Sequence, residues 1–256
     1  IIFEKYILNL KDLEKRYTDK QLKLAEKNFK KLKNSDIENL KLSIMGGLPA
    51  AEKKYTIKEF KKMLDAYSNV NEDELRSNLK EFLSAILPIA DDKKIKMAIH
   101  PDDPPIPLFG LPRIVSNMED FSYIFNSYKS DSNGMTFCAG SLASSFKNNV
   151  YEIFKKFKKK VNFIHLRNVY IEKDKKSFYE TNHLKGDVDF VKLIKLILEE
   201  ENRRKKLNFK NYNIPMRPDH GHCLLDDQRK KFNPGYSVIG RMMGLSELRG
   251  IIKSLQ

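Results

Sequence analysis

The sequence has little cysteine, no tryptophan and no long apolar run. Only Cys138 and Cys223 occur in 256 residues, so a disulfide framework is not indicated and a reducing cytoplasm is the expected location. No apolar run approaches the roughly 18 residues of a transmembrane helix, so we expect no membrane span. Residues 1–17 are apolar but interrupted by charge, which is not typical of a signal peptide. Hydrophobic residues still make up 41% of the chain, enough for one large core or two small ones.

The chain has an excess of positive charge, with a formal net charge of +14. Such a balance is compatible with binding to nucleic acid or to another anionic partner. However, 38 lysines accompany only 10 arginines, whereas surfaces that read bases and phosphates favour arginine. The lysines are also scattered among glutamates along helical stretches. We therefore favour compositional bias and expect neither nucleic-acid nor membrane binding, and keep a basic nucleic-acid-binding protein as a minor alternative.

The N-terminal part of the chain reads as helices and loops. Residues 4–34 are rich in Lys, Glu and Leu without Pro or Gly, which predicts one long helix or two shorter ones. Residues 41–52 contain Gly-Gly and Pro and predict a loop. Thr56 and Glu59 have the spacing of a capping box, so a helix should begin there and end near Tyr67.

A further helix is expected to open at Asn71, with acidic residues in its first turn. Its predicted core-facing stripe consists of Leu75, Leu79, Phe82, Leu83 and Ile86. The first 94 residues contain no convincing strand. We therefore divide the chain into a helical segment, 1–94, and an α/β part, 95–256, within one structural domain.

After residue 94 the sequence pattern changes to short apolar runs bounded by residues that favour turns. Helical patterns separate them at 117–128, 147–158 and 188–206. Alternating strands and helices are typical of a parallel α/β sheet. The four predicted strands are KMAIH (96–100), GMTFC (134–138), VNFIHLRN (161–168) and NIPMRPDHGH (213–222).

Each predicted strand ends near a residue that can bind a metal ion: His100, Cys138, His165 or Asp219. Taken singly, such a histidine is more often scaffolding, such a cysteine a small core residue, and such an aspartate a turn residue. In a parallel barrel, however, the C-terminal ends of all strands meet on one face. Two imidazoles, a thiolate and a carboxylate together suit a divalent cation, and ligand softness alone favours zinc.

Long motifs around these residues give the chain a resemblance to the mannonate dehydratase family. The similarity runs from about Ile44 to Ile251. The stretches that carry it are MAIHPDDPPIPLFGLPRIVS (97–116), GMTFCAGS (134–141), FIHLRN (163–168), SFYETNHLKGDVD (177–189), MRPDHGHCLLDD (216–227) and NPGYSVIGRMMGLSELRG (233–250).

The resemblance implies a TIM-type (β/α) barrel related to the xylose isomerase group. It implies a cytoplasmic lyase of hexuronate (glucuronate) catabolism that dehydrates D-mannonate to 2-keto-3-deoxy-D-gluconate. The implied cofactor is Mn²⁺ or Fe²⁺ rather than zinc, with the four ligands named above. The implied acid/base pair is His220 and Tyr236.

Other polar residues near these motifs are weaker candidates for the site. Arg167 and Arg217 lie beside ligands in the sequence, and either can bind the substrate carboxylate or form a structural salt bridge. His183 and Glu180 can reach the site from a loop after the third strand, and His222 is a further candidate for substrate binding.

Further expectations concern the residues beside these candidates and the assembly. Asp102 and Asp103 are expected to orient His100, whereas Cys223 is expected to be inert. A barrel needs eight strands, and only the C-terminal four are recognisable behind the helical segment. A truncated form is therefore an alternative, and a homo-oligomer acting on a small aldonate is expected. The main rival function is a sugar isomerase or a metal-dependent hydrolase on a related barrel.

Overall fold

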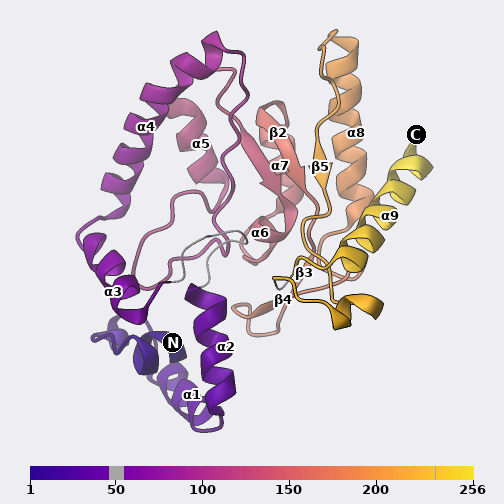
Figure 1. Ribbon diagram of the computed structural model, residues 1–256. Helices are drawn as coiled ribbons and strands as arrows, with labels where there is room; N and C mark the ends of the chain where they lie inside the picture. The colour runs from indigo at the N-terminus through magenta and orange to yellow at the C-terminus, as the bar shows by residue number, and fades with distance from the viewer. Residues whose placement is uncertain (46–54, 234) are drawn as a thin grey trace. The chain divides into compact units, whose positions relative to one another are not determined.

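The computed structural model describes residues 1–45, 55–233 and 235–256, which form two compact units (Figure 1). The first comprises Ile1–Asn71 with Pro107–Pro112, and the second Glu72–Ile106 with Arg113–Gln256. The boundary thus falls after Asn71, whereas the sequence suggested a division after residue 94 within a single domain. The long helix before residue 94 belongs with the sheet because its apolar side packs on the core of the second unit.

The first unit is helical, with α1 (Asp19–Phe29), α2 (Asn34–Met45) and α3 (Ile57–Ala66). The predicted capping box of Thr56 and Glu59 is confirmed, and the helix ends at Tyr67 as expected. Of the two alternatives for residues 4–34, one long helix is wrong. Short helical turns at Phe3–Ile7 and Leu13–Lys15 precede α1, because Asn9 and Asp12 adopt left-handed backbone conformations that interrupt a helix.

A small apolar core holds this unit together. Its buried members are Phe3, Ile7, Leu8 and Met45. The rings of Phe3, Phe60 and Phe109 contact one another, with centroids 5.5–6.0 Å apart. Met45 ends α2 inside the predicted loop at 41–52, so that prediction fails for residues 41–45, and residues 46–52 lie outside the described part of the chain.

The second unit is built on parallel strands in chain order. β1 (Met135–Cys138), β2 (Val161–His165) and β5 (Met216–Arg217) form a sheet in the order β1-β2-β5. A parallel bridge between Ile99 and Met135 places the first predicted strand beside β1. The four predicted segments are therefore neighbours in sequence order, although all four are shorter than expected, the first and the last most of all. Pro101 follows the first segment, and Pro215 and Pro218 flank β5, so backbone donors that would extend the pairing are missing.

One side chain crosses β1 and ties the first segment to β2. Asn162 donates a hydrogen bond of 2.6 Å from Nδ2 to the carbonyl oxygen of Met97. The backbone of Gly134 lies beneath this amide, and a Cβ there would come within 2.2 Å of it. Glycine at this position therefore permits the contact that holds residues 97–99 in register with the sheet.

Helices between the strands agree with the predicted pattern and cover the sheet. α5 (Met118–Ser127), α7 (Val150–Phe157) and α8 (Phe190–Lys206) lie within or close to the predicted ranges. Their N-caps are Asn117, Asn149 and Asp189, each of which accepts a backbone N–H from the first turn. Figure 1 shows α7 and α8 beside the sheet, and the two helices contact each other. Among the described residues, no helix has both the length and the apolar character to cross a bilayer.

Two elements of this unit differ from the sequence analysis. Glu180 and His183 were expected in a loop after the third strand, yet β4 (Phe178–Glu180) pairs antiparallel with β3 (Val169–Ile171). The C-terminal helix α9 (Val238–Leu255) was not predicted and contains three glycines. One of them, Gly244, is required because a Cβ there would lie 2.1 Å from the ring of His183. The buried Asp227 accepts the Ile239 N–H and fixes the start of the helix.

The core of the second unit collects phenylalanines from β1, α5 and α7. Phe121, Phe137 and Phe154 are fully buried, and Phe137 meets Phe154 edge to face at 5.1 Å. The short helix α6 (Ala139–Ala143) is buried along its whole length. α4 (Glu72–Asp92) packs on this core, but its predicted stripe is partly wrong. Phe82, which was predicted to face the core, is 55% exposed. Leu87, which was not in the predicted stripe, is fully buried.

We predict that Phe137→Ala lowers the free energy of unfolding by about 3–5 kcal/mol, because it leaves a cavity beneath Phe154. The matched control is Phe82→Ala, which removes an exposed ring and should change stability by only about 0.5 kcal/mol. Urea denaturation followed by circular dichroism measures both. Equal losses in the two variants would contradict the assigned core.

Candidate metal centre and acid–base pair

Three of the predicted ligands lie together at the C-terminal edge of the sheet. His100 follows the bridged segment 97–99, Cys138 is the last residue of β1, and His165 is the last residue of β2. Their ligand atoms all lie within 4.8 Å of one another. The register of the sheet produces this arrangement, because Cys138 pairs directly with His165 across β1 and β2. The set could hold a metal ion.

Asp219 borders this cluster from the loop after β5. Its Oδ2 lies 3.5 Å from Nδ1 of His165 and 4.0 Å from Sγ of Cys138. Its other oxygen, Oδ1, accepts a hydrogen bond of 2.6 Å from Arg217. The residue is buried, and its φ of 68° lies in the left-handed region, so the loop turns sharply where the carboxylate meets the histidine. One oxygen is thus held by Arg217 while the other faces the cluster.

The two histidines present ring nitrogens to each other. Nδ1 of His100 lies 2.6 Å from the carbonyl oxygen of Pro101, which can only accept, so this nitrogen carries the proton. The unprotonated Nε2 of His100 then faces Nδ1 of His165 at 3.2 Å. Burial lowers the pKa of His165 to about 4, with nearby Arg217 acting in the same direction and Asp219 against it. A neutral imidazole is the form that binds metal ions.

Cys138 is completely buried and caps α6. Its Sγ accepts hydrogen bonds from Oγ of Ser141 at 3.0 Å and from the backbone N–H of Ser141 at 3.5 Å. Burial raises the pKa of the thiol to about 11. A cation beside the sulfur is therefore needed to release its proton at neutral pH. Ser141 was not among the residues expected at the site, because cysteine is not a usual N-cap residue and the sequence therefore gives no local signal for this contact.

A second group of side chains begins one residue after Asp219. Nδ1 of His220 lies 2.5 Å from Oε1 of Glu180, and Nε2 lies 3.3 Å from the hydroxyl of Tyr236. A backbone bridge between Gly221 and Tyr236 brings these two segments together. Burial raises the pKa of Tyr236 above its usual value. The two residues expected to form an acid/base pair are thus hydrogen-bonded neighbours.

Arg167 lies buried between two carboxylates. Its guanidinium donates to both oxygens of Asp103, at 2.6 and 3.2 Å, and lies 3.4 Å from Oε1 of Glu180. Burial alone would raise the pKa of Asp103, but the ion pair with Arg167 outweighs it and the pKa is lowered. The backbone of Gly140 packs against this side chain, and a Cβ there would come within 2.4 Å of Nε. Arg167 is thus fixed by packing as well as by charge.

The expectation that Asp102 and Asp103 orient His100 is wrong. Asp103 pairs with Arg167, and Asp102 accepts from Ser116 and from the backbone of Val115. The protonated nitrogen of His100 uses the carbonyl of Pro101 instead. The backbone conformation after His100 decided this, and the sequence does not reveal it.

The remaining candidates lie around the loop that carries Asp219. The Nε2 of His183 donates to the carbonyl oxygen of Pro218 at 2.9 Å, and its ring rests on Gly244. The side chain of Arg217 is 47% exposed while it binds Asp219. His222 is exposed, as is Cys223, which carries a free thiol. His183 thus supports the loop from behind, whereas Arg217 and His222 are open to solvent.

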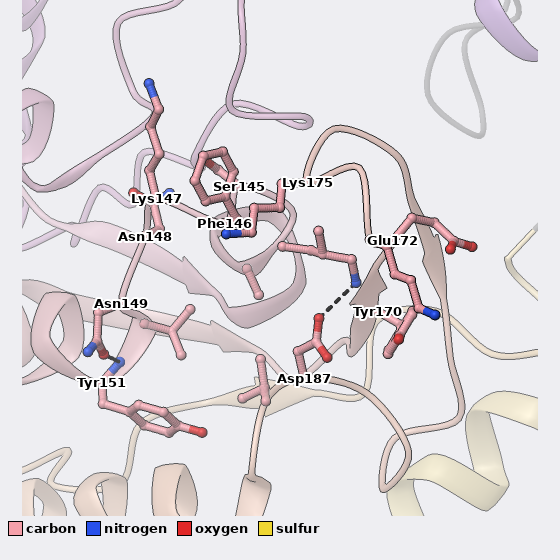
Figure 2. A pocket seen from close by; sticks show the side chains of 15 residues that line it. Ser145, Phe146, Lys147, Asn148, Asn149, Tyr151, Tyr170, Glu172, Lys175 and Asp187 are labelled. Carbon is pink, nitrogen blue, oxygen red and sulfur yellow. Dashed lines mark hydrogen bonds between the residues drawn. The ribbon is translucent and has the colours of Figure 1, made fainter.

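A separate cavity of about 640 Å³ lies beside the β3–β4 hairpin (Figure 2). The loop before α7, the β3–β4 hairpin and the segment before α8 line it, and one wall is closed by Asp187, which accepts the N–H of Ile171. Its lining contains none of the candidate ligands, acid–base residues or substrate contacts. We therefore do not assign the chemistry to this cavity.

Taken together, the fold and the site define an α/β protein with a potential metal centre and an acid–base pair at the ends of adjacent parallel strands. The sequence matches the family described as D-mannonate dehydratase (UxuA) over residues 4–256. The chain belongs to this family. The match begins within the helical N-terminal segment, earlier than the similarity from Ile44 that the motifs indicated.

Known relatives agree with this assignment. A mannonate dehydratase from Marinomonas sp. (strain MWYL1) is 42% identical over 249 residues, covering 97% of this chain and 63% of that protein. One from Brucella melitensis biotype 2 (strain ATCC 23457) is 42% identical over 254 residues, covering 99% and 62%. The crystal structure of mannonate dehydratase from Streptococcus suis serotype 2 superposes with a TM-score of 0.65 at 37% identity, covering 73% of this chain and 51% of that one. The chain thus spans less than two thirds of the length of these relatives.

We predict that His165→Ala abolishes stoichiometric Mn²⁺ binding. The loss of Mn²⁺ affinity should exceed the ~10–100-fold loss that follows from mutating a residue that only hydrogen-bonds to a metal ligand. The control is His222→Ala, an exposed histidine outside the cluster, which should bind like the unmodified chain. Isothermal titration calorimetry measures both. Retained stoichiometric binding by His165→Ala would refute the ligand assignment.

We also predict that metal binding releases about one proton at neutral pH, because the thiol of Cys138 with its raised pKa must ionise to become a ligand. Apparent affinity should therefore rise up to about tenfold per pH unit between pH 7 and 8.5. Calorimetry in buffers of different ionisation enthalpy counts the proton. The Cys138→Ser variant should not release this proton when it binds the metal. An unchanged number of released protons in that variant would show that another group ionises.

Proposed function

We propose that this chain dehydrates D-mannonate to 2-keto-3-deoxy-D-gluconate with the help of a bound divalent cation. One observation carries the proposal. Asp219, which borders the His/Cys/His cluster, and His220, which contacts Tyr236, are consecutive residues of one loop. A cation bound at the cluster and a substrate proton exchanged with His220 would therefore be close together, as removal of water from adjacent carbons requires. Membership of the D-mannonate dehydratase family supports this substrate.

The reaction needs a base at C2 and an acid at C3. The proton on C2 is weakly acidic because the neighbouring carboxylate is already negative. A base removes that proton, an acid protonates the C3 hydroxyl, and the C3–O bond breaks to release water. The enol that remains then tautomerises to the 2-keto acid. Each proton transfer requires a group held within hydrogen-bond reach of the substrate.

His220 and Tyr236 have complementary protonation states for these two steps. Because Nδ1 of His220 donates to Glu180, Nε2 carries the lone pair and is the basic atom. Tyr236, whose pKa burial raises, keeps its hydroxyl proton at neutral pH and donates it. We assign His220 as the base for the C2 proton and Tyr236 as the acid for the C3 hydroxyl.

His100, Cys138, His165 and Asp219 are the residues that would hold the cation. Their fit rests on the lone pair of His100 facing His165 and on a buried thiol that stays protonated without a positive charge beside it. When bound, the cation stabilises negative charge at C2 or polarises the departing hydroxyl. Mn²⁺ or Fe²⁺ is the proposed ion. Among the described residues there is one such cluster, which disfavours a hydrolase that uses several metals.

Arg217 is the better placed of the two candidate arginines for the substrate carboxylate. Its side chain is 47% exposed beside Asp219, whereas Arg167 is buried and occupied by Asp103 and Glu180. The exposed His222 remains a predicted substrate contact. His183, whose Nε2 is engaged by Pro218, would act by holding the loop that carries Arg217.

The architecture proposed for this function is a (β/α) barrel sheet and a homo-oligomer. The four parallel segments occur in chain order with helices between them, and the polar residues stand at their C-terminal ends, as in that fold. A sugar isomerase on a related barrel is the competing function. It would interconvert sugars without releasing water, so the products distinguish the two.

We predict that the chain with Mn²⁺ converts D-mannonate to 2-keto-3-deoxy-D-gluconate and that a chelator abolishes the reaction. His220→Asn and Tyr236→Phe should each lower kcat by about 10²–10⁴-fold, because each removes a proton-transfer group. The exposed Glu172→Gln is the matched control and should retain full activity. Detection of the keto acid measures the rate. Absence of product while Mn²⁺ binds would refute the proposed activity of this chain.

A further inference from the structure

We propose that Glu180 is a positioning residue that fixes the tautomer and orientation of His220, and that Arg167 holds Glu180 in place. This rests on the proposed function of His220 as the base. The geometry is a chain of contacts in which Oε1 of Glu180 lies 2.5 Å from Nδ1 of His220 and 3.4 Å from Arg167. On the other side of the ring, Nε2 lies 3.3 Å from the Tyr236 hydroxyl.

The carboxylate determines which ring nitrogen can act as a base. A neutral imidazole carries its proton on one nitrogen and its lone pair on the other. An ionised carboxylate only accepts hydrogen bonds, so its presence at Nδ1 favours the tautomer with the proton there. The lone pair is then at Nε2 and accepts from Tyr236. Without Glu180, the proton can move to Nε2 and the basic atom turns away from Tyr236.

Backbone hydrogen bonds hold the segment that carries Glu180. Glu180 ends β4 and pairs with Val169 of β3, and the next residue, Thr181, donates its N–H to the carbonyl of Asn168. β3 follows β2 after only three residues, one of which is Arg167. The pairing of β4 with β3 thus brings Glu180 close to Arg167.

The ion pair with Asp103 holds the guanidinium of Arg167 next to Glu180. Two hydrogen bonds to Asp103 orient the guanidinium, and Gly140 packs beneath it. The same terminal nitrogen, Nη1, that binds Asp103 lies 3.4 Å from Oε1 of Glu180, so this carboxylate oxygen contacts both the guanidinium and His220. Glu172 belongs to the same hairpin but is exposed to solvent. It offers the same charge and side chain without these contacts.

The first experiment reads the tautomer of His220 directly and needs no turnover. Chains labelled with ¹⁵N-histidine are compared by NMR in the metal-free state, at a pH where the ring is neutral. A His220→Gln spectrum identifies the signals of this ring. In the unmodified chain and in Glu172→Gln, we expect the proton on Nδ1. In Glu180→Ala, the ratio of the Nδ1–H to the Nε2–H tautomer should fall at least about tenfold.

Glu180→Gln keeps the shape of the side chain and guards against a folding defect in Glu180→Ala. The amide can either accept from Nδ1 or donate to it, so the tautomer preference should be weakened in this variant as well. An unchanged preference for Nδ1–H in a folded Glu180→Ala or Glu180→Gln chain would overturn the proposal. This result is independent of whether D-mannonate is the substrate.

The second experiment separates positioning from binding. With D-mannonate, Glu180→Ala should lower kcat by about 10²-fold while KM changes less than about twofold, because the substrate contacts remain. Glu180→Asp should restore part of kcat by supplying a carboxylate one methylene shorter. A loss confined to KM would contradict the positioning role. If the unmodified chain shows no turnover, the proposed function fails while the NMR result still decides this inference.

Discussion

The parallel register of β1, β2 and β5 is the constraint on which the site depends. Cys138 pairs with His165, and His165 pairs with Arg217, two residues before Asp219. Residues from distant parts of the chain therefore end at one level of the sheet. A shift of one residue in this register would turn alternate side chains to the opposite face and separate the ligand atoms. Close backbone contacts, such as that of Asn162 over Gly134, help to exclude such shifts.

Charges inside the site are arranged in pairs that leave specific atoms available. Arg217 occupies one oxygen of Asp219 and leaves the other facing the cluster. Arg167 is bound by Asp103 and still reaches Glu180. Buried or partly buried charges need such partners because water does not solvate them fully. The same pairings that stabilise the charges also fix the orientations of His165 and His220, so stability and chemistry share these contacts.

Local signals in the sequence predicted many helices and the polar residues near the ends of the buried segments. The capping box at Thr56 and the starts of α5 and α8 depend on residues within one turn, so a local pattern is sufficient. By contrast, α9 depends on a glycine that accommodates His183, and β4 depends on pairing with β3. Phe82 fits an apolar helical stripe, yet the direction in which α4 packs leaves it exposed. These features depend on residues that are distant in the sequence.

The sequence by itself determined the family, the alternation of strands and helices, and the residues that end the strands. The family follows from the resemblance of the motifs, and the other two properties follow from local spacing and from side-chain chemistry. The tertiary structure decided the pairing of Asp103 with Arg167 and the contact of Glu180 with His220. It did so because hydrogen bonds require atoms within about 3 Å and in line, and only the packed sheet, hairpin and loops set those positions.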